Sequence, residues 1–127
     1  MPWPMRRESV WRMLLALLAA LVATLALTPT PPEHISLGWD KLNHAAAFAA
    51  LAVCAALGWP DAPTARQVVV LLALLAFGGT IELLQRHVPG RSAEWADLLA
   101  DAIGIVVGAL LACGWLRRRH DTPQSPP

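Results

Sequence analysis

The sequence has no tyrosine, only two phenylalanines and two cysteines, and few charged residues. Its formal net charge is only +1, and no basic stripe with interleaved aromatic residues is present. A surface for nucleic acid is therefore not expected. Both cysteines lie in apolar stretches without a CxxC motif, so we expect small apolar side chains rather than a redox pair or disulfide.

Long apolar runs make up most of the chain. Hydrophobic residues are 56% of the 127, chiefly leucine, alanine and valine. They form four runs, each long enough as a helix to cross a hydrocarbon layer of ~30 Å: residues 11–28, 42–59, 68–85 and 96–116. The connecting segments are rich in proline, glycine and polar residues. The sequence therefore predicts an all-α integral membrane bundle of four transmembrane helices.

The domain organisation follows from these spans. Residues 11–116 form one membrane domain, with an N-terminal tail over 1–10 and a disordered C-terminal tail over 117–127. The first span also resembles a signal peptide, with a basic start and an apolar centre. No small-x-small cleavage site follows it before "TPTPP", so we expect it to be retained as an anchored helix.

The positive charges predict the orientation. Lys41, Arg86 and Arg91 fall on one side of the predicted bundle, and the other seven of the ten Lys and Arg fall on the opposite side. The positive-inside rule then places both termini in the cytoplasm. We expect a multi-pass protein of the bacterial inner membrane, whose polar end faces outward.

Polar side chains inside or beside the spans gather at this outer end. Ionisable groups in membrane helices face the bundle interior or a water-filled cavity, and they mark a functional site by default. Within each helix they are three or four residues apart, so they share a face. The predicted ligand-binding residues are Asp40, Lys41, His44, Glu82, Gln85, Arg91, Asp97 and Asp101.

Helix capping does not account for all of these groups. Glu82 lies near the C-terminal end of its helix, where the dipole disfavours an anion. We therefore expect a short contact from Glu82 to Lys41 or Arg91, with His44 nearby. Should the site be catalytic, His44, Glu82 and Asp97 are the candidates for acid–base chemistry. A metal site formed by these three residues is chemically possible, but nothing at metal-ligand spacing supports it, so we predict no metal and no cofactor.

Asp97 and Asp101 lie four residues apart, on one face of the last span. We expect Asp97 to be ionised, beside Arg91 and the helix N-terminus, and the deeper Asp101 to be partly protonated. Simpler alternatives remain for two acids near helix starts. Asp40 would serve as an N-cap and Asp97 as a first-turn charge, while Glu94 in the preceding loop is expected to be solvated.

Small residues form a ridge on the same side of the last span. The ridge includes a GxxxG motif at Gly104 and Gly108, which indicates close packing of this face against another helix. The two acids would then enter a protein interior rather than lipid. A homo-oligomer, if one forms, is expected to use this glycine face.

The ordered motifs "DKLNHAAAF" and "IELLQRHVPGRSAEWADLLADAIGIVVG" resemble the VanZ-like membrane protein family. The shared pattern is Asp-Lys-x-x-His, Glu-x-x-Gln, a Pro-Gly-Arg loop, an Asp four residues before an Asn, and trailing glycines. It covers about residues 40–108, with Asp101 where the family has Asn. The resemblance implies a small multi-span protein, and the family's namesake is associated with low-level resistance to teicoplanin, a lipid-tailed glycopeptide antibiotic.

Two functions remain open. In the first, the protein binds an envelope lipid or glycolipid and contributes to glycopeptide resistance. Arg91 and Lys41 would hold an anionic head group, and the carboxylates an amine or sugar hydroxyls. In the second, it is a membrane-embedded enzyme acting on an envelope lipid or glycan, with His44 and a carboxylate exchanging protons. A transporter is disfavoured, because four spans contain no second inverted half.

Overall fold

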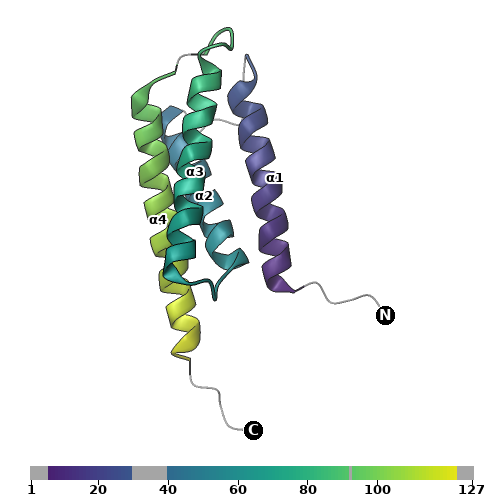
Figure 1. Cartoon of the computed structure of the whole chain (residues 1–127), viewed down its shortest axis with the longest axis vertical. Helices are drawn as coiled ribbons and strands as arrows, with labels where there is room; N and C mark the ends of the chain where they lie inside the picture. The colour runs from purple at the N-terminus through teal and green to yellow at the C-terminus, as the bar shows by residue number, and fades with distance from the viewer. Residues whose placement is uncertain (1–5, 30–39, 92, 123–127) are drawn as a thin grey trace, which may run out of the picture.

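The structure is a computed structural model that describes residues 6–29, 40–91 and 93–122. Four helices follow one another up and down the bundle (Figure 1): α1 (Arg7–Leu27), α2 (Asp40–Gly58), α3 (Thr64–Gln85) and α4 (Trp95–His120). Each is long and apolar enough to cross a membrane. The predicted all-α, multi-pass architecture is therefore confirmed.

All four helices begin before the predicted spans, and two of them extend into the expected tails. α1 begins at Arg7 and α4 ends at His120, so residues 7–10 and 117–120 are helical rather than parts of the expected tails. Hydropathy marks only the apolar part of a helix. In α4 the added last turn carries three arginines and a histidine, and positive charge is favoured at a helix C-terminus. Residues 1–5 and 123–127 of the expected tails lie outside the described residues.

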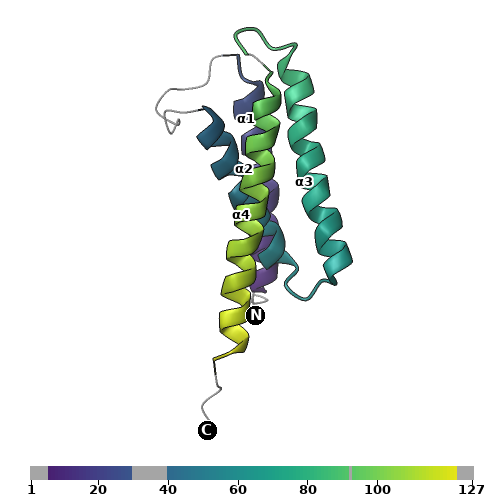
Figure 2. The same cartoon turned by 90° about the vertical axis from the view of Figure 1, so that its left-hand side faces the viewer.

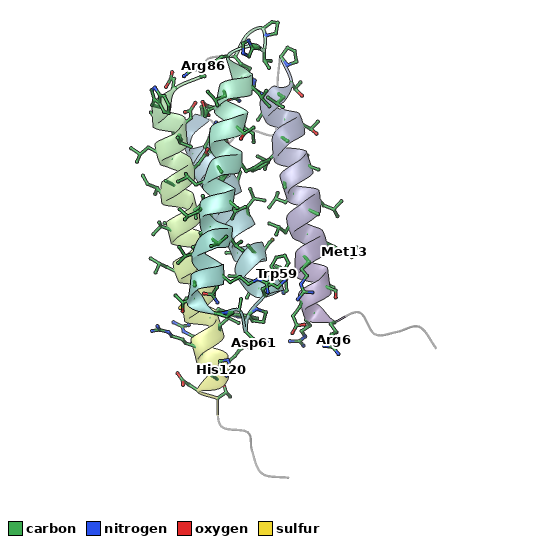
Figure 3. All side chains as sticks on the ribbon, viewed as in Figure 1. Arg6, Met13, Trp59, Asp61, Arg86 and His120 are labelled. Carbon is green, nitrogen blue, oxygen red and sulfur yellow. The ribbon has the colours of Figure 1, made fainter. Side chains whose placement is uncertain are left out.

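The two ends of the bundle are distinguished by labelled residues in Figure 3. Arg6, Asp61 and His120 lie at one end, which we call the His120 end, and Arg86 lies at the opposite one, the Arg86 end. At the Arg86 end α1 and α3 finish and α2 and α4 begin. This topology brings the polar starts of α2 and α4 beside the polar finish of α3.

α2 and α4 form the centre of the packing. Four of the six residues in the buried core cluster come from α2, and α3 and α4 contribute one each: Phe48, Leu51, Ala52, Ala55, Leu74 and Ile105. α4 packs against both α2 and α3 (Figure 2), whereas no residue of α1 is buried. Large apolar side chains cover the outer faces, as expected of helices surrounded by lipid, and Leu110 is 67% exposed.

α4 approaches α2 most closely at two glycines. A Cβ atom placed on Gly104 would lie 2.2 Å from the carbonyl oxygen of Ala45, and one on Gly108 would lie 2.2 Å from that of Ala49. Only glycine fits at such a contact. The GxxxG face therefore joins two helices of the same chain, and the homo-oligomer expected through this face would need another surface.

We predict that Gly104→Ala will lower the free energy of unfolding by about 1–3 kcal/mol, because the added methyl group must push α4 away from α2. The matched control is Gly114→Ala, since a Cβ there has no described atom within 4 Å. That control should be neutral or slightly stabilising, because alanine favours a helix. Thermal unfolding followed by circular dichroism in detergent measures both. Equal stability of the two variants would contradict the tight contact.

Candidate functional site

Polar residues from α2, α3 and α4 come together at the Arg86 end. Six of the eight predicted ligand-binding residues contact one another there, and Glu94 from the loop before α4 joins them. We call this set the His44 cluster: Asp40, Lys41, His44, Glu82, Glu94, Asp97 and Asp101. Five carboxylates thus surround one lysine and one histidine.

His44 lies at the centre of the cluster. Its Nδ1 is 2.9 Å from Asp101 Oδ1 and 4.0 Å from Glu82 Oε1. Its Nε2 faces Asp40 Oδ2 at 3.9 Å and Asp97 Oδ2 at 4.0 Å. When Nδ1–H donates to Asp101, the neutral ring presents Nε2 as an acceptor or ligand atom. The ring is therefore oriented by one carboxylate and open toward two others.

Lys41 and Glu94 close the outer side of the cluster. Lys41 Nζ is 2.9 Å from Glu94 Oε2 and 3.6 Å from Asp97 Oδ1. The Glu94 backbone N–H also donates to Glu82 Oε2, at 3.3 Å. Glu94 is solvated as expected, with its side chain 53% exposed, but its contacts with Lys41 and Glu82 were not predicted. In the sequence, only the position of Glu94 immediately before α4 could have indicated a role in the site. Many loop residues occupy such a position without a functional role.

Three carboxylates of the cluster are buried: Asp101 is 0% exposed, Asp97 1% and Glu82 7%. One oxygen of each, Asp101 Oδ2, Asp97 Oδ1 and Glu82 Oε1, has no hydrogen-bond partner among the described residues. A buried polar atom left in this way costs about 1–3 kcal/mol. Unpaired oxygens on buried acids favour a ligand that brings positive charge or hydrogen-bond donors.

Gly78 allows α3 to lie against Asp101. A Cβ atom there would be 2.6 Å from Asp101 Oδ2 and 3.1 Å from Phe48 Cζ. The spacing of ionisable residues along the sequence gives no indication of this residue. A pair of glycines inside an apolar helix, at residues 78 and 79, was the available signal, because glycines there often mark close helix contacts.

Gln85 and Arg91 lie apart from the cluster, contrary to prediction. Gln85 Nε2 donates to the Ala26 carbonyl at 2.9 Å, and Arg91 Nε donates to the Thr28 carbonyl at 3.0 Å. Arg91 also donates to the Leu25 carbonyl. Carbonyl groups at a helix C-terminus have no partner within the helix, and positive charge is favoured beside them. The two side chains thus cap α1.

Because Arg91 binds the end of α1, Glu82 and Asp97 have other basic partners than predicted. Within the described residues neither Lys41 nor Arg91 forms an ion pair with Glu82, and the nearest base is His44. Asp97 likewise contacts Lys41 and His44 rather than Arg91. The prediction that His44 would lie near Glu82 is confirmed. The basic partner was misassigned, because the fold of the loop onto α1 cannot be inferred from spacing along single helices.

A cavity of about 290 Å³ lies between α3 and α4, directly beside the cluster. Small and apolar side chains form most of its wall, while Glu82, Glu94, Arg86 and Trp95 line its polar part. The guanidinium of Arg86 is 5.9 Å from the centre of the Trp95 ring. Because Trp95 is 75% exposed, the cavity is bordered by the outer surface of the bundle.

The fold and the site define a small multi-pass membrane protein with a buried polar cluster at one end of a four-helix bundle. The model of the VanZ/LLP1 family matches residues 5–117, from before α1 to the last turns of α4. The chain belongs to this family. The resemblance seen over residues 40–108 is thus confirmed and extends to α1. No curated protein and no solved structure shows significant similarity to the chain.

Proposed function

We propose that the protein binds an amphipathic envelope molecule, a lipid or a lipid-linked glycan, at the Arg86 end. The position of Glu82 carries this proposal. Its buried carboxylate lines the largely apolar cavity and contacts His44 of the cluster. An acyl chain would occupy the apolar wall of the cavity, and polar groups of the same molecule would meet Glu82 and Glu94. Ligand sites combine an apolar lining and a few convergent polar groups in this way.

The charges of the site favour a ligand with amine or hydroxyl groups. Lys41 already contacts two carboxylates, and Arg91 binds the end of α1. Neither is available for the anionic head group that the sequence analysis assigned to them. A phosphate on the ligand would instead meet Arg86, which is exposed at the cavity. The acids would accept hydrogen bonds from the amine or sugar hydroxyls.

A membrane-embedded enzyme acting on such a molecule is the second candidate function. Its supporting observation is the 2.9 Å contact between His44 and Asp101, which orients the ring while Nε2 faces two further carboxylates. A general base needs such an orienting partner and an open nitrogen. Conversion of a bound, isotopically labelled envelope lipid by the purified protein would distinguish this function from binding alone.

The orientation is also a proposal, since ligand access from the envelope requires the Arg86 end to face outward. Reporter fusions after residue 62 should read cytoplasmic, and fusions after residue 90 should read periplasmic. The reason is the excess of Lys and Arg at the His120 end of the spans. Phosphatase and fluorescent-protein fusions in a bacterial host measure this. If the fusions after residue 62 read periplasmic and those after residue 90 read cytoplasmic, both the predicted orientation and the proposed binding of an envelope molecule would be wrong.

We predict that Gly79→Leu will fill the cavity and remove the ligand. A Cβ at Gly79 has only Leu98 Cδ1 nearby, at 3.9 Å, so a larger side chain extends into the cavity without meeting backbone. Lipids that co-purify with the protein and are enriched over the bulk membrane extract should fall several-fold by mass spectrometry. Any teicoplanin resistance that wild type confers on a susceptible host should fall with them.

The matched control is Gly114→Leu, which adds the same side chain to an exposed position at the other end of α4. It should retain the wild-type lipid set. Thermal unfolding of both variants verifies that each is folded. If Gly79→Leu retains the same enriched lipids as Gly114→Leu, the cavity is not the binding place.

The two aspartates of α4 should differ in their response to amide substitution. Asp97→Asn should reduce ligand retention by about tenfold or more, because it removes a buried charge whose Oδ1 receives no hydrogen bond from the described residues. Asp101→Asn should be mild, since an amide oxygen can still accept the His44 hydrogen bond. Lipid retention measured as above tests this pair. A severe Asp101→Asn beside a mild Asp97→Asn would reverse the assignment.

A further inference from the structure

His44 has the surroundings of a metal-binding histidine. Histidines that bind a metal through one nitrogen usually donate the other N–H to a carboxylate, which fixes the tautomer and the ring orientation. Here Asp101 Oδ1 is 2.9 Å from Nδ1, and Asp101 is fully buried at the contact of α3 with α4. The lone pair of Nε2 is thereby directed toward the opposite side of the ring.

Two carboxylate oxygens lie on that side. Nε2 is 3.9 Å from Asp40 Oδ2 and 4.0 Å from Asp97 Oδ2, and one ligand atom from each of the three residues lies within 4.8 Å of the others. Bonds of roughly 2.0–2.2 Å in a tetrahedral zinc site place ligand atoms about 3.4 Å apart. The histidine–carboxylate distances are therefore about half an ångström wider than in a zinc site.

Asp97 supplies an independent indication of a cation. Its side chain is 2% exposed, and its Oδ1 accepts no hydrogen bond from the described residues. Lys41 Nζ, at 3.6 Å from Oδ1, is too distant for a hydrogen bond and is held more closely by Glu94. A buried carboxylate in such a position requires a pairing or coordinating cation. Oδ2 is directed toward His44 Nε2, where that cation would lie.

We propose that Asp40, His44 and Asp97 bind one divalent metal ion. One imidazole nitrogen with two carboxylate oxygens suits Zn²⁺, and three protein ligands leave a coordination position open, as in catalytic zinc sites. Asp40 is 62% exposed at its side chain, so the ion can enter from the water at the Arg86 end. Asp101 is a positioning residue that acts through His44. The site shares Asp97 with the proposed lipid site, but it is tested with the metal alone, so the two proposals can fail separately.

The sequence did not indicate this site because its ligands come from two helices. Asp40 and His44 are one turn apart on α2, a spacing that places both on one face. The third ligand is more than fifty residues further on, and only the packing of α4 on α2 brings it to His44. The prediction of no metal rested on spacing along single segments.

Zinc binding to the purified full chain tests the proposal. The protein, carrying an affinity tag without histidine, is stripped with a chelator in detergent and titrated with ZnCl2 by isothermal calorimetry. We expect one Zn²⁺ per chain and a higher unfolding temperature with zinc. Asp40→Asn, His44→Asn and Asp97→Asn should each weaken binding by at least about tenfold, because each removes a ligand. Asp61→Asn, an exposed acid at the His120 end, is the matched control and should bind like wild type.

The role of Asp101 is tested by two substitutions. Asp101→Ala should weaken zinc binding by about 10- to 100-fold, as loss of an orienting carboxylate does. Asp101→Asn should retain most of the affinity, because the amide oxygen still accepts the hydrogen bond. Helical content by circular dichroism without zinc verifies that each variant is folded. Equal affinities for the two variants would show that Asp101 does not orient the ring.

Two results would overturn the site. One is the absence of stoichiometric zinc binding to the folded wild type. The other is binding that survives Asp40→Asn but is lost in Glu82→Gln, which would place the ion on the Nδ1 side of His44, among Glu82 and Asp101. The unfolding temperature provides a second readout, since zinc should raise it in wild type and in Asp61→Asn but not in His44→Asn.

Discussion

The close approach of α4 to α2 determines where every acid of α4 lies. Gly104 sits against the Ala45 carbonyl, one residue after His44. Asp101 is three residues and Asp97 seven residues before that glycine, so all three share a helix face. Because the contact at Gly104 fixes how α4 lies on α2, Asp97 and Asp101 are placed beside His44. A side chain at Gly104 would displace the helix and the site together.

This packing also explains why a membrane helix can begin with two aspartates. A carboxylate in the hydrocarbon costs roughly 2.5–3.5 kcal/mol even on lenient scales. Asp97 and Asp101 avoid lipid entirely, since they are 1% and 0% exposed within the bundle. The residues that face lipid on the same helix, such as Leu99 and Val106, are apolar. The acids are concentrated on the one face that never meets the bilayer.

Hydropathy and spacing along the chain predicted the four helices, the gathering of polar groups at one end and six members of the site. They did not predict Glu94, Gly78 or the true partners of Gln85 and Arg91. Helix periodicity indicates which residues share a face, but it does not indicate which helix that face meets. The loop that folds Arg91 onto α1 joins residues more than sixty positions apart. Such contacts depend on the packing of whole helices.

The interactions that fix α1 in the bundle determine which charged side chains remain available in the His44 cluster. Apolar contacts between helices gain little in a membrane, because lipid tails are equally apolar. α1 has no buried residue, and polar groups fix both its ends: Arg12 donates to the Gly58 carbonyl at one end, while Gln85 and Arg91 cap the other. Arg91 is therefore committed to α1. The His44 cluster retains one lysine among five carboxylates, and that imbalance favours the cation or hydrogen-bond donor that we propose as its ligand.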